Sequence, residues 1–295
     1  MPIPDKQVGD WSLQADSTLP GWTHSVLHDA LHHAKPLQGL GVEIFVQGSY
    51  ANSTNVRKHS DVDLVAQLKL PLEEDVRRLS QPEVELFYQH YEKTDYGWEE
   101  FREDVLRSLR EQFFVREGNK CIDITDMDSL LRVPADILPA IEFRRYSAFP
   151  SLAGEVYEEG VFFRDASGRA IVNFPKQHLA NGKVKDKATG GRFKQVVRVY
   201  KNARRHETAH IEKDSAPSYF LECLLYNVPD RLFRASLSEA YLGCLGWLSE
   251  HRDKFGDFTC QNKLVGLFGS RQGQWSITSA ENLISALNNQ WEAWD

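Results

Sequence analysis

The chain has 295 residues and a formal net charge of −7, and it is 41% hydrophobic, 11% aromatic and 26% charged. This length allows one large domain or two ordinary ones, and the apolar content excludes a wholly disordered chain. No run of about 18 apolar residues and no basic-then-apolar N-terminus is present, so we expect neither a membrane span nor a signal peptide. The acidic balance argues against a protein that binds nucleic acid over a broad basic surface.

The cysteines indicate a reducing environment. The chain has four, which stand far apart at Cys121, Cys223, Cys244 and Cys260. Without a CxxC pair they predict neither a structural zinc site nor a disulfide framework. We therefore expect a soluble cytoplasmic protein with reduced thiols.

The first half of the chain mixes helices and strands. Apolar spacing predicts a helix over residues 20–35, strands over 42–46 and 62–68, and a charged amphipathic helix over 96–113. Further strands are expected over 114–115, 121–124 and 130–143, and a hairpin over 161–164 and 170–174.

The second half is helical. We expect helices over residues 193–205, 217–227 and 236–250, and a last one from Thr278, where Thr278 and Glu281 fit a capping box. The Gly- and Lys-rich stretch 181–191 is the best boundary between a catalytic core of residues 1–180 and a helical part of residues 181–295. A cleft between two such parts is a common ligand site.

Two aspartates at the start of the second predicted strand are the main chemical signal. Asp61 and Asp63 are two residues apart, so their carboxylates project from the same face of the strand while Val62 and Leu64 face the core. Adjacent carboxylates repel one another unless cations hold them together. Two-metal sites for phosphoryl transfer need such a pair, although an Asp-x-Asp alone is also common at solvated strand ends.

A short turn motif precedes these aspartates. Gln47, Gly48 and Ser49 follow the first predicted strand, and 12 positions separate Ser49 from Asp61. Glycine lets the backbone approach a ligand closely, and Ser49 can donate its hydroxyl and N–H groups to a phosphate. The whole combination resembles the nucleotidyltransferase superfamily of the polymerase-β type, which implies an α+β fold with a mixed sheet.

That resemblance implies a third carboxylate on a neighbouring strand. Asp136 is our choice, because it stands between apolar residues and precedes Pro139 and Ala140. Asp123, between Ile122 and Ile124, is a competitor. Asp126 and Asp128 form a second Asp-x-Asp, but their neighbours are typical of a loop.

The helical half narrows the resemblance. Residues 193–205 place Lys194, Arg198, Lys201 and Arg205 on one helix face, and the sequence APSYFLE follows at 216–222. With the upstream motif, these segments resemble the oligoadenylate synthase and cyclic GMP-AMP synthase branch, and most closely its bacterial members, the CD-NTases of cyclic-oligonucleotide-based antiphage signalling (CBASS). The resemblance covers roughly residues 22–230 and continues as a helical C-terminal part.

The resemblance also implies roles for particular residues. Lys201 matches the lysine that contacts the donor triphosphate, Ser218 a small polar residue near the phosphates, and Tyr219 a tyrosine that stacks on a base. Asn173, at the end of the predicted hairpin, could read the edge of uracil or adenine, or simply begin a turn. His178 and Asn181 could line the same pocket, although Asn181 could equally cap a helix.

The implied reaction joins nucleoside triphosphates, ATP among them, into a cyclic di- or trinucleotide with loss of pyrophosphate. Asp61 and Asp63 would hold two Mg²⁺ ions, which Mn²⁺ could replace, and Asp136 would bind the catalytic metal. The zinc-ribbon cluster of the animal enzyme is missing, so we expect constitutive activity or activation by a protein partner, and no activation by DNA.

Two alternatives remain open. An RNA- or tRNA-modifying nucleotidyltransferase would share the carboxylates but would need a basic RNA-binding surface. An inactive nucleotide-binding sensor or scaffold would have no need of Asp61, Asp63 and Ser49. His28 and His32, four residues apart, are interpreted as an exposed helix face and not as metal ligands.

Overall fold

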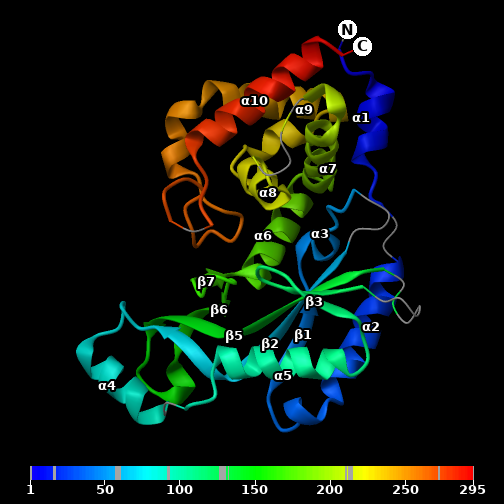
Figure 1. Cartoon of the computed structure of the whole chain (residues 1–295). Coiled ribbons are helices and arrows are strands. Elements are labelled where there is room, and N and C mark those ends of the chain that lie inside the picture. Colours follow the sequence, from blue (N-terminus) through cyan, green and yellow to red (C-terminus); the bar gives the residue numbers. More distant parts are fainter. Residues whose placement is uncertain are drawn as a thin grey trace. The chain divides into compact units, whose positions relative to one another are not determined.

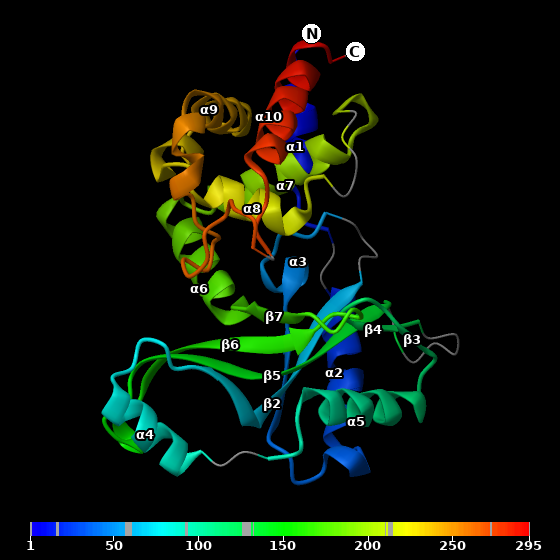
Figure 2. The same cartoon turned by 60° about the vertical axis from the view of Figure 1, so that its left-hand side comes forward.

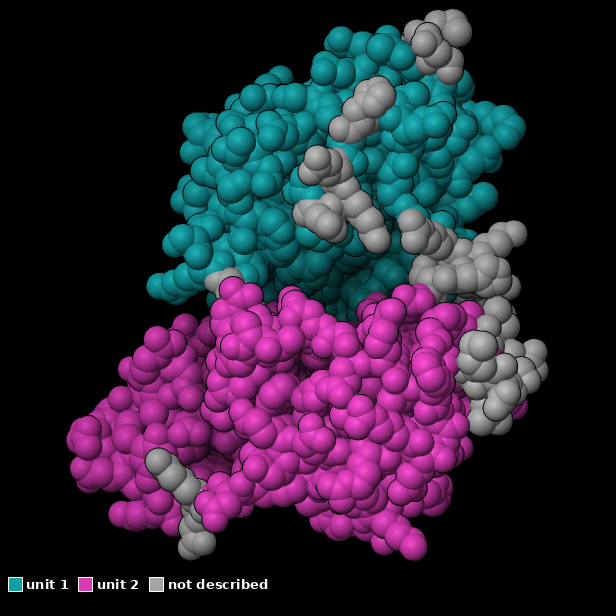
Figure 3. Space-filling view, viewed as in Figure 1, with its two compact units in different colours: residues 1–16, 48–58, 177–295 teal, residues 17–47, 59–176 magenta. Residues whose placement is uncertain are grey.

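The computed structural model describes residues 2–15, 18–56, 61–91, 94–125, 131, 133–209, 211, 215–271 and 273–294. The chain folds into two compact units. One consists of residues 17–47 and 59–176 and the other of residues 1–16, 48–58 and 177–295, as coloured in Figure 3. We call them the sheet unit and the helical unit. The division at residue 180 inferred from the sequence stays a prediction.

The described part of the sheet unit contains a seven-stranded mixed sheet with the order β1-β2-β5-β4-β3, and β6 and β7 continue from β5. The strands are β1 (Val42–Val46), β2 (Val62–Asp75), β3 (Val115–Glu117), β4 (Ile122–Ile124), β5 (Ala135–Ala148), β6 (Val156–Arg164) and β7 (Ala170–Asn173). The pair β2–β5 is parallel and the other pairs are antiparallel. This confirms the α+β class with a mixed sheet that the sequence indicates.

The two faces of the sheet differ in character. Val62, Leu64 and Ile137 are fully buried on one face, and helices α2 (Thr18–His32) and α5 (Trp98–Arg110) pack against the sheet side by side (Figures 1 and 2). The other face carries Asp63 and Asp136, because residues paired directly across two strands project from the same side. This polar face holds the candidate site.

A third helix packs near the C-terminal end of strand β5. Helix α4 (Gln81–His90) lies at this end of the sheet unit (Figure 2). Its Phe87 packs against Tyr146 and Phe149 in a small aromatic cluster. At its N-terminus, the Glu83 carboxylate accepts from Ser80 N at 2.9 Å and from Ser80 Oγ at 2.6 Å, as in a capping box.

The helical unit has its own apolar core. The remaining α-helices are α1 (Asp5–Ser12), α3 (Gly48–Ala51), α6 (Pro175–Ala188), α7 (Arg192–Arg205), α8 (Ser218–Tyr226), α9 (Leu237–Glu250) and α10 (Ile277–Glu292). Helix α1 packs on α7 and α9, and its residues Val8 and Trp11 join the same core as Phe193, Tyr200 and Phe220. No helix among the described residues is both long enough and apolar enough to span a bilayer.

Several boundaries differ from the sequence predictions. Residues 181–188, which belong to the stretch predicted as the boundary between the two parts, continue helix α6, and Gly190 and Gly191 just beyond its end adopt positive φ angles of 66° and 81°. Strand β2 extends to Asp75 because it pairs with β5 beyond a register shift. The last helix is capped by Ser276, whose Oγ accepts from Ser279 N at 3.0 Å, and not by Thr278. Helices α1 and α4 were not predicted.

Candidate functional site

Three aspartates lie in a row across the polar face of the sheet. Asp63 of β2 pairs with Asp136 of β5, and Asp136 pairs with Asp123 of β4. Directly paired residues bring their side chains close together on one side of the sheet. Asp61 comes two residues before Asp63 and is exposed. The structure therefore brings the predicted carboxylate pair, the predicted third carboxylate and its competitor to one place.

The row concentrates negative charge. Burial first, and then the charges of Asp61 and Asp123, raise the pKa of the Asp136 carboxyl to about 6, and Arg116 opposes this rise. Burial, followed by the charges of Asp136, Asp63 and Asp123, also raises the pKa of the neighbouring Cys121 thiol to about 12. A carboxyl whose pKa rises beside like charges indicates a site that favours a cation.

Asp123 differs from Asp136 in its partner. Both guanidinium nitrogens Nε and Nη2 of Arg116 donate to Asp123 Oδ2, at 3.1 and 2.9 Å. Asp123 is thereby engaged by a cation of the chain itself. Asp126 and Asp128 lie outside the described residues.

The row suits a divalent cation in donor type and charge, since carboxylate oxygens are the ligands that Mg²⁺ prefers. Among the described residues, however, no group of three or more His, Cys, Asp and Glu side chains is placed to hold a metal ion together. The carboxylates thus share a region without converging on one point. By residue type and position, Asp61, Asp63 and Asp136 are the residues of this region that could hold a metal.

The turn after β1 continues from the sheet unit into the helical unit. Gln47 N donates to Asp63 O at 2.8 Å, so Gln47 extends the pairing of β1 with β2. Gly48 has a φ of 67°, a conformation that glycine adopts without strain, and its carbonyl accepts from Asn52 N. Ser49 is half-buried in the four-residue helix α3. Gly48 and Ser49 belong to the helical unit.

The basic face of α7 is more buried than the sequence indicates. Lys201 is 2% exposed, and its Nζ lies 2.7 Å from Glu222 Oε1 and 3.1 Å from both oxygens of Thr54. Arg198 is also buried and donates to backbone carbonyls. Lys194 is half-buried, and burial lowers its pKa while the charge of Asp186 opposes this effect. Of the four predicted basic residues, Arg205 alone is exposed.

Ser218 and Tyr219 form the first turn of α8. Ser218 is half-buried, and Tyr219 is 38% exposed. One face of the Tyr219 ring stacks on His178, with centroids 4.9 Å apart and planes 25° apart. The ring centroid of Trp275 lies 5.8 Å from that of Tyr219. An aromatic ring held between neighbours in this way is suited to stacking on a nucleotide base.

The remaining predicted pocket residues lie in both units. Asn173 is exposed on β7 and pairs with Val161 of β6, which in turn pairs with Glu142 of β5. Glu142 and Asp136 are an even number of residues apart on β5, so both of them and Asn173 project from the same face of the sheet. His178 is buried and its Nε2 lies 3.2 Å from Glu222. Asn181 lies inside α6, where its side chain donates to Gln261 O at 2.9 Å, and does not cap a helix.

Sequence reasoning missed Glu222. This residue is 5% exposed and contacts Lys201, Thr54 and His178 through its carboxylate. Burial alone would raise its pKa, but the charge of Lys201 and hydrogen bonds from His178 and Lys201 lower it to about 2. The available signal was one glutamate in the otherwise apolar helix SYFLECLLY.

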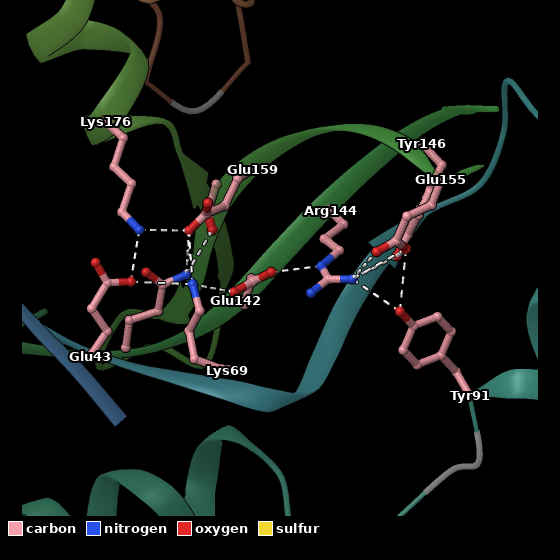
Figure 4. Close-up of polar contacts among 11 residues, drawn as sticks. Glu43, Lys69, Tyr91, Glu142, Arg144, Tyr146, Glu155, Glu159 and Lys176 are labelled. Atoms are coloured by element: carbon pink, nitrogen blue, oxygen red, sulfur yellow. Dashed lines mark hydrogen bonds and ion pairs between the residues drawn. The ribbon is translucent and has the colours of Figure 1, made fainter. Parts of the chain in front are cut away.

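A network of charged residues occupies the same sheet face farther along the strands (Figure 4). Buried Glu142 lies 2.5 Å from Lys69 Nζ and 2.6 Å from Arg144 Nε. Lys176 Nζ lies 2.8 Å from both Glu43 Oε2 and Glu159 Oε1, and Lys69 contacts the same two glutamates. The network ties β1, β2, β5 and β6 to Lys176 at the start of α6, three residues after Asn173.

Comparison with known proteins finds a nucleotidyltransferase family model in each half of the chain. Residues 31–163 match a nucleotidyltransferase domain, and residues 180–292 match the cGAS/DncV-like nucleotidyltransferase C-terminal helical domain. The cyclic UMP-AMP synthase of Rhodothermus marinus is 35% identical over 298 residues, which covers 100% of this chain and 99% of that protein. The cyclic nucleotide synthase CdnE01 of Staphylococcus haemolyticus is 34% identical, with 100% of each chain covered.

A solved structure agrees. The Rhodothermus marinus CdnE c-UMP-AMP synthase with Apcpp and Upnpp superposes with a TM-score of 0.88 at 34% identity, over 99% of this chain and 98% of that one. This likeness extends over both units of the chain, the mixed sheet that carries the aspartates and the helical unit. The chain therefore belongs to the cGAS/DncV-like nucleotidyltransferases, the family that includes these cyclic nucleotide synthases.

Proposed function

We propose that the protein condenses nucleoside triphosphates into a cyclic di- or trinucleotide and releases pyrophosphate at each bond formed. The observation that carries this proposal is the pairing of Asp63 with Asp136 on the polar face of the sheet, in a chain that aligns over its full length with cyclic nucleotide synthases. A catalytic core of residues 1–180 and a helical part of residues 181–295 are the domains that we propose for it.

The aspartates are the proposed catalytic residues. Asp61, Asp63 and Asp136 would hold two divalent ions, Mg²⁺ or Mn²⁺, whose positive charge would supply electrostatic stabilisation at the reacting phosphate. Asp136 accepts the proton of the acceptor ribose hydroxyl. The hydroxyl oxygen forms a bond to the α-phosphorus of the donor, and the bond from that phosphorus to pyrophosphate breaks. A second reaction of the same kind closes the ring.

The proposed substrate-binding residues flank these carboxylates in the sequence. Gln47, Gly48 and Ser49 approach the donor phosphates, and Ser218 on α8 contributes a hydroxyl. Lys194 and Lys201 supply positive charge to the triphosphate region. Tyr219 stacks on a base, a contact worth about 1–3 kcal/mol.

We propose ATP as one substrate and test UTP first as its partner, because the Rhodothermus marinus relative is named a cyclic UMP-AMP synthase. Asn173 is the proposed reader of a base edge, since it is exposed and projects from the face that carries Asp136. Its amide offers both a donor and an acceptor.

We further propose that the product serves CBASS-type antiphage signalling in the cytoplasm. The four cysteines are unpaired, as a reducing compartment favours. Activity is constitutive or set by a protein partner, and double-stranded DNA does not activate the enzyme.

The decisive experiment incubates the protein with each pair of ATP, GTP, CTP and UTP, with Mg²⁺ or Mn²⁺ and with EDTA as the control. Products are treated with phosphatase and identified by mass spectrometry. A phosphatase-resistant cyclic product that disappears in EDTA is expected. Linear products only, or nucleotides added to RNA, would overturn the proposal in favour of a different nucleotidyltransferase.

A further inference from the structure

Two lysines share the same pair of carboxylate oxygens on the polar face of the sheet (Figure 4). Lys176 Nζ lies 2.8 Å from Glu43 Oε2 on β1 and 2.8 Å from Glu159 Oε1 on β6. Lys69 Nζ on β2 lies 3.2 and 3.1 Å from the same two oxygens. Three of these residues belong to strands, whereas Lys176 stands in the first turn of α6. The contacts therefore fasten the start of that helix to β1 and β6.

The strands hold one of these glutamates in place without help from α6. Gln67 of β2 is fully buried, and its Nε2 donates to Glu159 Oε1 at 3.3 Å. Lys69, which also contacts Glu159, lies 2.5 Å from the buried carboxylate of Glu142. Polar side chains that satisfy one another in a connected network keep a defined geometry. Glu159 is thus a fixed anchor point for the lysine of α6.

Each residue between the end of β7 and that lysine is constrained. Asn173 is the last residue of β7 and pairs with β6. Phe174 is 2% exposed, and its ring centroid lies 6.0 Å from that of Phe143. Pro175 begins α6, and its own ring fixes the φ angle there. With Lys176 held by two carboxylates, the connection is fastened at both ends.

Gly160 lets the same connection lie directly against β6. A Cβ atom on Gly160 would stand 2.7 Å from Asn173 O and 3.0 Å from two carbons of the Phe174 ring. The first distance is shorter than the contacts that Cβ atoms make, so glycine fits there and a larger residue would force a shift. Gly160 directly follows Glu159 in the chain. The residue against which Asn173 lies and the anchor of Lys176 are therefore consecutive in β6.

The side chain of Asn173 is exposed while its backbone is held. Its amide offers a donor and an acceptor to the edge of a base. The edge of a purine lies farther from the sugar than the edge of a pyrimidine, so the position of the amide decides which size of base it can meet. Specificity is a difference between two affinities, and a reading group that can move supports a smaller difference.

We infer that Lys176 is a positioning residue for base selection. Through Glu43 and Glu159 it fixes the connection from β7 to α6, and so sets where Asn173 presents its amide. In this arrangement Lys176 acts on the base through Asn173. The role of Asn173 as a base reader rests on the proposed function, whereas the anchoring of residues 173–176 does not.

The test compares variants of the anchor with variants of the reader. Lys176→Met removes the charge at a similar length, and Lys176→Arg keeps a charge that two carboxylates can share. Glu43→Gln weakens the anchor from its other partner without altering the connection itself. Asn173→Ala removes the amide, and it is also combined with Lys176→Met. The control is Arg164→Met on β6, because the Arg164 side chain is 35% exposed against 36% for Lys176 and its Nε lies 3.0 Å from Glu99.

Isothermal titration calorimetry measures the Kd of non-hydrolysable UTP and GTP analogues for each variant. We expect Lys176→Met and Glu43→Gln to move the ratio of the two Kd values about fivefold towards unity, since the ion pairs that they break are half-exposed. Lys176→Arg and Arg164→Met should keep the ratio within about twofold of the wild type. In the Asn173→Ala background, Lys176→Met should change the ratio by no more than about twofold, because its effect passes through the amide.

An effect of Lys176→Met that persists undiminished in the Asn173→Ala background would overturn the inference, because Lys176 would then act without Asn173. An unchanged ratio in folded Lys176→Met and Glu43→Gln proteins would overturn it as well. Absence of a cyclic product from the wild type would instead refute the proposed function. Hydrogen exchange of the peptide covering residues 170–178 would still decide the anchoring, since Lys176→Met should accelerate it and Arg164→Met should not, and unchanged exchange in both would contradict the anchoring.

Discussion

Asp63 and Asp136 are direct neighbours on adjacent parallel strands, and their pairing places two carboxylates on one face of the sheet. Asp123 extends the row by one strand but is engaged by Arg116 at 2.9 Å. Aspartates in adjacent positions therefore have different partners, and a substitution series can test whether their roles differ.

We predict that Asp63→Asn and Asp136→Asn each lower the rate of cyclic product formation by about 10³-fold or more, because each removes a charged oxygen donor from the proposed two-metal site. Asp123→Asn should retain activity within about tenfold. The measurement is the initial rate of product formation by mass spectrometry, with far-UV circular dichroism to verify folding. An inactive Asp123→Asn beside an active Asp136→Asn would reverse the assignment of the third carboxylate.

Tyr219 allows a test of base stacking. Tyr219→Leu removes the aromatic ring and should weaken binding of a nucleotide analogue by about 1–3 kcal/mol, or roughly 10- to 100-fold. Tyr219→Phe keeps the ring and loses a hydroxyl that contacts groups of the chain itself, namely Asn262 at 3.4 Å and the thiols of Cys223 and Cys260, so its affinity for the nucleotide should stay close to that of the wild type. Isothermal titration calorimetry measures both. Equal losses in the two variants would argue against stacking.

Lys69 stabilises the fold through Glu142. Glu142 is 1% exposed, and its Oε2 lies 2.5 Å from Lys69 Nζ. Lys69→Met leaves this buried carboxylate with Arg144 as its remaining ion-pair partner among the residues that the structure describes. Because Lys69 itself is 36% exposed, we expect a loss of about 1–3 kcal/mol rather than the full cost of breaking a buried pair.

Urea denaturation measures this loss, and Lys6→Met is its control. Lys6 pairs with Asp10 at 2.7 Å on the surface, so its replacement should leave the denaturation midpoint close to that of the wild type. Similar midpoints for the two variants would show that the charge network does not stabilise the sheet unit.

The lowered pKa of Glu222 predicts that the folded protein loses stability in acid. Its pKa is lowered to about 2 in the folded protein, from an ordinary value of 4.5, so its contribution is fully present above about pH 5 and is lost as the pH falls toward 2. The facing groups are Lys201, His178 and Thr54. Since each pKa unit corresponds to about 1.4 kcal/mol, the contribution is on the order of 3 kcal/mol.

The free energy of unfolding of wild type and Glu222→Gln, measured in urea between pH 6 and pH 3.5, checks this dependence. The wild type should be more stable at pH 6, and its advantage should shrink as the pH falls below about 4.5. A difference that stays constant over this range would contradict the prediction.

The spacing of apolar residues predicts many of the helices and strands, because each kind of element has its own repeat along the sequence. The bounds predicted for strand β1 agree with those in the structure, and the strand predicted over residues 62–68 forms the first part of β2. The family, the fold class and the class of enzyme were likewise predicted and are confirmed by the comparisons.

Other features depend on contacts between distant segments. Asp123 and Asp136 look alike in sequence because strand order, which makes them neighbours, is a tertiary property. The burial of Lys201 was missed for the same reason, since its partners Thr54 and Glu222 are 147 and 21 positions away. Helix α1 is only eight residues long and is stabilised by packing on α7 and α9, which its own sequence does not show.

The helical unit is assembled from three separate stretches of chain, and this limits how the protein can be divided. A fragment beginning at residue 177 would lack Val8 and Trp11 of α1 and all of residues 48–58, so it would expose apolar surface on α7 and α9. It would also deprive Arg198 of its acceptors Ser12 O and Ser53 O, and Lys201 and Glu222 of Thr54. Such a fragment should aggregate when it is expressed alone. Split-protein or domain-swap versions therefore need to carry α1 and the 48–58 segment together with the C-terminal helices.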